Sequence, residues 1–236
     1  MQRTQSLTFR RLALCAAGAC IALGAAQSHA QGDDSTCFVF KTVGRLEPED
    51  YRKASARLKI VEDYHFGPMV ESLIRPMQVG MAIGSDLDYT LWGYPNHHRA
   101  LVTLVRLGAR EKTDQPRGTN FTIDCYFRRA LRIASDDYIV RMIYASYLGS
   151  VNRRADGLRQ LNYVVESAED SPVTHYNAGL IYMELGELDK AAAQAKRALE
   201  LGYPRQELRT ELQRRGAWPA EAPASAASAA SATGGQ

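Results

Sequence analysis

The chain has 236 residues, of which 45% are hydrophobic and 23% are charged, and its formal net charge is +3. This charge comes from three Arg within residues 1–30, where no acid occurs, so residues 31–236 carry 26 basic and 26 acidic side chains. Proteins that bind nucleic acid or lie on an anionic membrane usually carry an excess of basic residues, and residues 31–236 have no such excess. We therefore expect no nucleic-acid partner and only indirect membrane contact.

Residues 1–30 have the three regions of a secretory signal peptide. Their basic residues precede an apolar stretch over 12–26, and Ser28 and Ala30 place small residues at −3 and −1. About fifteen apolar residues are few for a membrane span. We therefore expect a periplasmic protein cut after Ala30. A lipid anchor at Cys20 and a retained N-terminal anchor are the alternatives.

Two cysteines, Cys37 and Cys125, lie beyond the signal peptide. An even number of cysteines in an oxidising compartment favours a disulfide, here closing a loop of almost 90 residues, for which chain entropy predicts about 4–5 kcal/mol. The alternative is two unrelated buried thiols. Residues 31–94 do not share the repeat found further along the chain. We expect them to form a mostly irregular segment that packs on the repeats.

The region around the start of the repeats holds the most suggestive chemistry, namely Asp86, Asp88, His97 and His98, with His65 upstream. A metal site or an acid–base pair could be built from such residues. However, neighbouring histidines on a helix point about 100° apart, and the zinc-binding i, i+4 spacing is absent. The favoured interpretation is that these residues cap helices and bond to the chain. We therefore expect no catalytic residue, metal or cofactor.

Residues 176–191 carry the clearest pattern. Small residues at Gly179, Ala191 and Ala198 let two antiparallel helices approach closely, and Gly186 can end the first helix in the left-handed conformation. This pattern resembles a tetratricopeptide repeat (TPR), a helical hairpin that stacks on its neighbours and forms a concave binding surface.

A related pattern lies upstream at the period that is typical of TPR units, and a weaker third one precedes it if a polar surface loop is inserted. We therefore expect an all-α, TPR-like superhelix of three helical hairpins. The expected segments are a signal peptide at 1–30, an N-terminal segment at 31–94, units at 95–137 (with the insertion at 109–120), 138–171 and 172–204, a capping helix at 205–218 and a disordered Ala/Ser/Pro tail at 219–236.

Three blocks carry a wider resemblance: Asp86 to Leu101, Lys59 to Phe66 and Asp124 to Ala130. Together with the repeats, they resemble a group of exported bacterial TPR proteins of an unassigned family. The resemblance runs from about Cys37 to Trp218. It implies an envelope protein and brings no catalytic residue with it.

The first helices of TPR units line the concave face. The residues expected to form a partner-binding groove there are His98, Val102, Arg106, Met142, Ser146, Tyr176, Leu180 and Met183. Of the positions that grip a C-terminal carboxylate in some repeat proteins, only Asn177 matches, so we expect an apolar or amphipathic segment as partner. Whether the groove is open or filled by residues 37–94 stays undecided.

The leading hypothesis is a periplasmic scaffold or assembly factor that acts through its repeats without catalysis. One alternative is a hydrolase or metal-dependent enzyme that uses Asp86, Asp88, His97 and His98. Another is a structural envelope protein that associates with itself. The sequence names neither the partner nor the oligomeric state.

Overall fold

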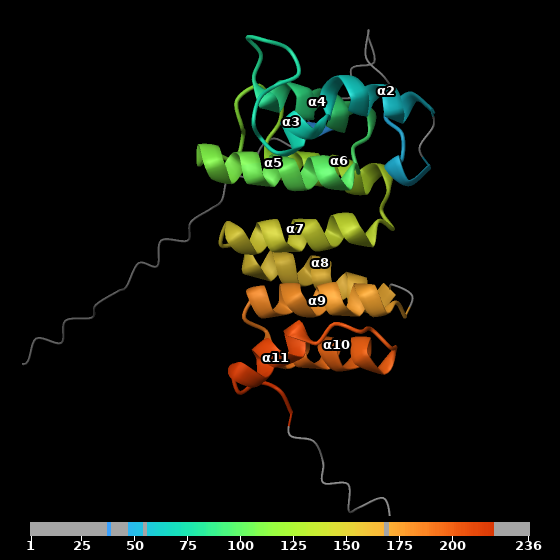
Figure 1. Ribbon diagram of the computed structural model, residues 1–236, viewed down its shortest axis with the longest axis vertical. Coiled ribbons are helices and arrows are strands. Elements are labelled where there is room, and N and C mark those ends of the chain that lie inside the picture. Colours follow the sequence, from blue (N-terminus) through green and yellow to red (C-terminus); the bar gives the residue numbers. More distant parts are fainter. Residues whose placement is uncertain (1–36, 39–46, 54–55, 168–169, 220–236) are drawn as a thin grey trace, which may run out of the picture. The chain divides into compact units, whose positions relative to one another are not determined.

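The computed structural model describes residues 37–38, 47–53, 56–167 and 170–219 (Figure 1). The regular elements of these residues are all helical, which confirms the all-α, TPR-like prediction. They are η1 (Tyr51–Lys53), α2 (Ala56–His65), α3 (Pro68–Glu71), α4 (Ile83–Gly93), α5 (His98–Glu111), α6 (Ile123–Ile133), α7 (Tyr138–Ser150), α8 (Arg154–Ser167), α9 (Pro172–Glu184), α10 (Leu188–Glu200) and α11 (Glu207–Arg214).

The predictions for the signal peptide, Cys20, the cut after Ala30 and the tail after residue 219 lie outside the described residues. Within the described part, none of the helices combines the length and the apolar character that a membrane crossing requires.

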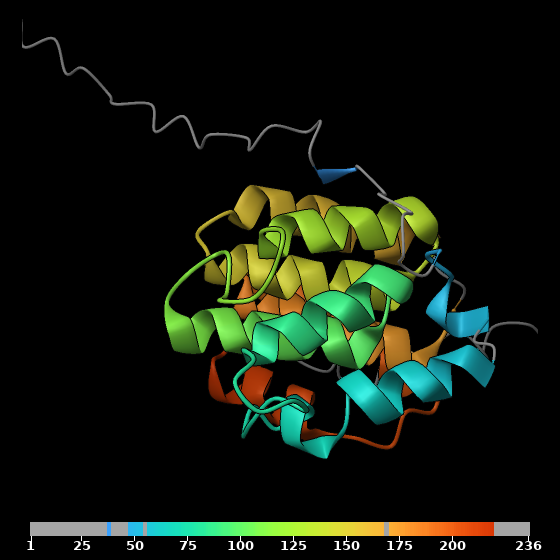
Figure 2. The same ribbon diagram turned by 90° about the horizontal axis from the view of Figure 1, so that it is seen from above.

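The pairs α7–α8 and α9–α10 lie side by side as antiparallel hairpins (Figures 1 and 2). Their turns have the same geometry at equivalent positions. Asn152 has φ 62° and Gly186 has φ 78°, and the following residues, Arg153 and Glu187, each donate a 2.8 Å backbone hydrogen bond to the preceding helix. Gly and Asn adopt this left-handed conformation with little strain, which explains why both turns close so tightly.

The predicted first unit contains α5 and α6, and here the helix limits differ from expectation. α5 continues through the start of the predicted insertion to Glu111 and ends at Lys112, which has φ 55°. The loop that follows returns to α6 through a 2.8 Å bond from the Ile123 amide to the Asp114 carbonyl. Thr122 then caps α6 by accepting a bond from the Cys125 amide. The loop therefore runs over residues 112–122 and is shifted along the chain from the predicted 109–120.

The expectation that residues 31–94 are mostly irregular is wrong for residues 56–93, where α2, α3 and α4 lie. The turn after α4 has almost the same backbone angles as the turn after α6. Tyr94 has φ −132° and ψ 79°, and Ala134 has φ −138° and ψ 76°. The helices of residues 56–93 therefore continue the stack of helices. The two similar turns, at Tyr94 and Ala134, are further apart in the sequence than one TPR period, so a search for that period misses this segment.

Helix α7 joins two hydrophobic clusters. Its residues Val140, Tyr144 and Leu148 belong to a cluster with α4, α5 and α6. Its residues Met142 and Ala145 belong to a second cluster with α8 to α11. The second cluster is rich in Ala, which allows α9 and α10 to approach closely. The capping helix α11 covers it with Leu208 and Leu212, both buried.

The predicted disulfide between Cys37 and Cys125 is confirmed, with Cα atoms 5.6 Å apart. It attaches the N-terminal part of the described chain to α6. The buried guanidinium of Arg129, one turn further along α6, donates a 2.8 Å bond to the Cys37 carbonyl. The same guanidinium lies over the rings of Trp92 and Phe121. Through these contacts, α6 holds Cys37 and the chain next to it in place.

Candidate functional site

The two carboxylates of α4 hold different segments of the chain. Asp86 is buried and accepts hydrogen bonds from the Met77 amide at 2.9 Å and from the His65 ring at 3.1 Å. Asp88 is also buried and accepts bonds from the amide and side chain of Asn120. Asp86 therefore binds the chain that precedes α4 to this helix, whereas Asp88 binds the end of the insertion loop to it.

His97 caps α5. Its Nδ1 accepts a 3.2 Å bond from the Ala100 amide, so its Nε2 carries the proton and donates to Glu62 at 3.0 Å. The ring is enclosed by Tyr51 and Phe66, with centroid distances of 4.3 and 4.8 Å. Burial lowers the pKa of His97 although the contact with Glu62 opposes this, so the ring is neutral and able to cap at neutral pH.

His98 belongs to a different network, centred on Asp137. The Asp137 carboxylate caps α7 and bonds to His98 Nε2 at 2.9 Å and to Asn96 Nδ2 at 2.8 Å. Burial alone would raise the pKa of Asp137, but the hydrogen bonds from His98 and Asn96 outweigh it and hold the pKa below the ordinary value. Asn96 also bonds to Asp50 and to the Tyr51 amide.

These contacts connect three parts of the chain: residues 50–52, the turn between α4 and α5, and the turn between α6 and α7. The four residues that suggested chemistry do not converge on one site, because each has its own structural partners. Among the described residues, no group of three or more His, Cys, Asp or Glu side chains could hold a metal ion. Sequence reasoning missed the pairing of His97 with Glu62 and of His98 with Asp137, because these partners lie far apart in the sequence.

The predicted groove residues lie on α5, α7 and α9 but differ in accessibility. Val102 and Arg106 are exposed, and His98, Ser146, Leu180 and Met183 are half-buried. Met142 and Tyr176 are only 6% and 5% exposed and belong to the second hydrophobic cluster. Of the two possibilities that the sequence left open, an open or a filled groove, burial of these two residues agrees with the filled one at their positions. Their role and that of the other six in binding a partner stays a prediction.

The chain covers parts of the wall at both ends. The Tyr176 ring lies 4.7 Å from the ring of Tyr203, in the segment that leads to α11. At the other end, the Arg106 and Arg110 guanidinium groups donate to the carbonyls of Glu71 and Leu73, at the end of α3 and just after it. Both the N-terminal and the C-terminal segments of the described chain therefore contact this face.

An uncovered strip remains at the start of the first helices. Ile139 on α7 is 48% exposed and Val173 on α9 is 49% exposed. Each is the second residue of its helix, which places the two at equivalent points of adjacent hairpins, and α7 and α9 contact each other. Further along the same helices, Ser146 Oγ donates a 2.9 Å bond to Glu184. The strip is apolar at one end and polar at the other.

Comparison with protein families matches residues 172–202, the α9–α10 hairpin, to the family described as tetratricopeptide repeat. The chain contains a tetratricopeptide repeat. The TPR match covers the unit in which the sequence pattern is clearest. Neither the curated proteins nor the solved structures gave a match to this chain. TPR hairpins generally bind proteins or peptides and are typically not catalytic, so the repeat indicates a role in protein–protein interaction.

Proposed function

We propose that this TPR protein is exported to the periplasm of a bacterium, where it serves as a scaffold or assembly factor for envelope proteins. Its partner would be a protein segment with an apolar or amphipathic face. The signal-like residues 1–30 support export, and so does the Cys37–Cys125 disulfide, because disulfides persist in oxidising compartments.

The observation that carries the proposed binding role is the pair Ile139 and Val173. Both are β-branched, half exposed and one repeat apart on adjacent first helices. A partner helix or strand crossing α7 and α9 would bury both side chains, each worth roughly 1 kcal/mol at about 25 cal/mol per Å² of apolar surface. The half-buried Leu180 and Met183 extend the apolar surface along α9.

The enzyme alternative has no comparable support. Asp86, Asp88, His97 and His98 are each engaged in contacts that hold helices and loops together. Self-association of the same strip is the remaining alternative, and the experiment below distinguishes it from a scaffold.

The test is crosslinking in intact envelopes followed by purification of the protein. We expect the Ile139→Ser, Val173→Ser double variant to lose specific crosslinked partners while keeping the wild-type melting temperature. The matched control is Ile60→Ser, which changes a comparably exposed apolar residue on α2 and should keep every partner. Undiminished capture by the double variant would refute the proposal. Crosslinks only between copies of this chain would favour the structural alternative.

A further inference from the structure

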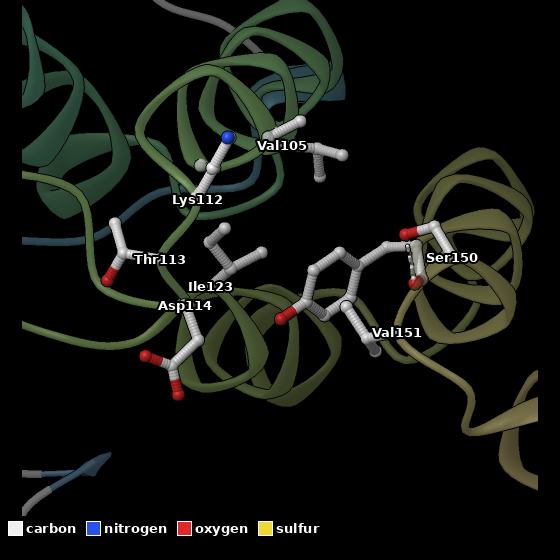
Figure 3. Close-up of a pocket in the computed structure, with 10 residues that line it drawn as sticks. Val105, Lys112, Thr113, Asp114, Ile123, Ser150 and Val151 are labelled. Atoms are coloured by element: carbon white, nitrogen blue, oxygen red, sulfur yellow. Dashed lines mark hydrogen bonds between the residues drawn. The ribbon is translucent and has the colours of Figure 1, made fainter.

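A pocket of about 390 Å³ lies where the C-terminal ends of α5 and α7 meet the start of α6 (Figure 3). Its walls include Val105, Ile123, Tyr147 and Val151. In Figure 3, Lys112, Thr113 and Asp114 lie on one side of the pocket and Ser150 and Val151 on the other, with Ile123 between them. This volume falls within the usual range of small-ligand sites.

The insertion that distinguishes the first unit builds this pocket. In the α7–α8 and α9–α10 hairpins, a short turn brings the second helix back at once. After α5, the chain instead turns at Lys112 and passes Thr113 and Asp114 before it returns to Ile123. The missing Cβ of Gly108 permits this course, because an added Cβ would stand 2.9 Å from the Thr113 carbonyl oxygen.

The wall also contains a polar group without a protein partner. Tyr147 lines the pocket and is only 7% exposed, and its hydroxyl, which has no hydrogen bond to a residue that the structure describes, is open to solvent rather than enclosed. The neighbouring tyrosines behave differently: Tyr144 donates a 2.6 Å bond to Asp124, and Tyr126 bonds to Asp88. A hydroxyl that a buried ring presents to a cavity, without a protein partner, is available to a ligand.

The charges around the pocket favour an uncharged ligand. Lys112 and Asp114 are exposed at the rim, and in Figure 3 their charged groups point away from each other. Burial, together with the charges of Asp124 and Asp114, raises the pKa of Tyr147 to about 12, so the hydroxyl stays neutral. Because Lys112 and Asp114 line the pocket with opposite signs, the pocket has no net charge that would offset the hydration lost by a charged ligand group.

We infer that this pocket binds a small molecule with an apolar ring or branched body and one uncharged hydrogen-bonding group, which pairs with the Tyr147 hydroxyl. The apolar body lies against Val105, Ile123 and Val151. This site is independent of the partner strip on α7 and α9, so either can exist without the other.

The test uses three probes that share one ring: benzyl alcohol, benzoate and toluene. Binding to the purified protein is followed through the NMR signals of the Val105 and Ile123 methyl groups during titration. Benzyl alcohol should give saturable shifts, whereas benzoate should bind at least tenfold more weakly because of its charge. Toluene should bind about fivefold more weakly, since it lacks the hydrogen bond.

Two variants locate the site. Tyr147→Phe removes only the hydroxyl and should weaken benzyl alcohol about fivefold to the level of toluene, while Tyr163→Phe on α8 should change nothing. Val151→Trp fills the pocket from its exposed edge and should abolish the shifts, while Ile60→Trp, a change at an exposed apolar residue on α2, should not. If Val151→Trp does not fold, nuclear Overhauser contacts between the benzyl ring and Ile123 of the wild type give the same information.

Three results would overturn the inference. They are the absence of saturable shifts with benzyl alcohol, unchanged affinity in Tyr147→Phe, and benzoate binding as tightly as benzyl alcohol. Shifts spread evenly over α9 and α10, instead of gathering at Val105 and Ile123, would also refute it.

Discussion

In the second hairpin, Gly157 on α8 lies directly against the backbone of Ala145 on α7: a Cβ on Gly157 would stand 2.8 Å from the Ala145 carbonyl oxygen. The third hairpin reverses the two residue types. There, Gly179 is on the first helix, and its added Cβ would stand 3.3 Å from the carbonyl oxygen of Ala191 on the second. In both of these hairpins one glycine lies at the crossing point, on the second helix in one and on the first helix in the other.

Gly179→Leu should destabilise the protein by at least the roughly 1–3 kcal/mol that is typical of overpacking. The added side chain would meet Leu208 of α11 at 2.7 Å as well as the backbone of α10, so it separates α9 from two neighbours at once. Urea unfolding followed by circular dichroism measures the change. The control is Ala155→Leu on the exposed face of α8, which should alter the free energy of unfolding little. An unchanged midpoint for Gly179→Leu would contradict the observed packing.

Tyr176→Ser should cost several kcal/mol of stability, because the Tyr176 ring is part of the second hydrophobic cluster and leaves a cavity when it is removed. Val173→Ser, one turn earlier on the exposed side of α9, should cost less than about 0.5 kcal/mol. Thermal unfolding of both variants separates a closed wall from an open groove. Equal melting temperatures would mean that Tyr176 is accessible in solution.

Asp137→Ala should destabilise the protein by about 3 kcal/mol, because the change removes the cap of α7 and leaves His98 Nε2 and one of the two amide hydrogens of Asn96 without an acceptor. Asp136→Ala is the matched control, because the neighbouring carboxylate is largely exposed and its ion pair with Arg52 is worth little. Urea unfolding of the two variants gives the comparison. If both variants lost the same free energy of unfolding, the hydrogen bonds around Asp137 would not stabilise the protein more than an exposed ion pair does.

Acidification should reduce stability through His97. Its pKa in the folded protein is below the ordinary value of 6.5, so below pH 6.5 the unfolded chain binds a proton that the folded chain does not. The stability is therefore fully present above pH 6.5 and is lost as the pH falls toward the folded pKa, by at most about 1.4 kcal/mol per pH unit.

His97→Asn keeps a capping side chain but cannot titrate. Its stability should be lower overall and should change less than that of the wild type between pH 7.5 and pH 5.5, as measured by urea unfolding at each pH. Equal pH dependence in both proteins would assign the effect to other groups.

Replacing both Cys37 and Cys125 by Ser should lower the free energy of unfolding by roughly 2–4 kcal/mol, because the disulfide closes a long loop. Alkylation of the exported wild type without reductant should label neither thiol. Complete labelling of both in freshly isolated periplasm would show that the bond does not form in the cell.

The sequence by itself determined the helical class, the third repeat and its register, because these rest on local rules. Small residues at fixed spacing and a left-handed residue at the turn describe a hairpin wherever it occurs, as Gly179 and Gly186 do here. The pairing of Cys37 with Cys125 was also predictable, because the sequence offers no other cysteine after residue 30.

Only the tertiary structure decided which side chains are accessible and which polar residues meet. Met142 and Tyr176 occupy concave positions by their spacing, but packing against neighbouring helices and the segment before α11 buries them. His97 with Glu62, and Asp137 with Asn96 and His98, are contacts between residues that are distant in the chain. The pocket beside Tyr147 likewise depends on the path of an inserted loop. Periodicity describes one helix at a time, whereas burial depends on what the rest of the chain places against it.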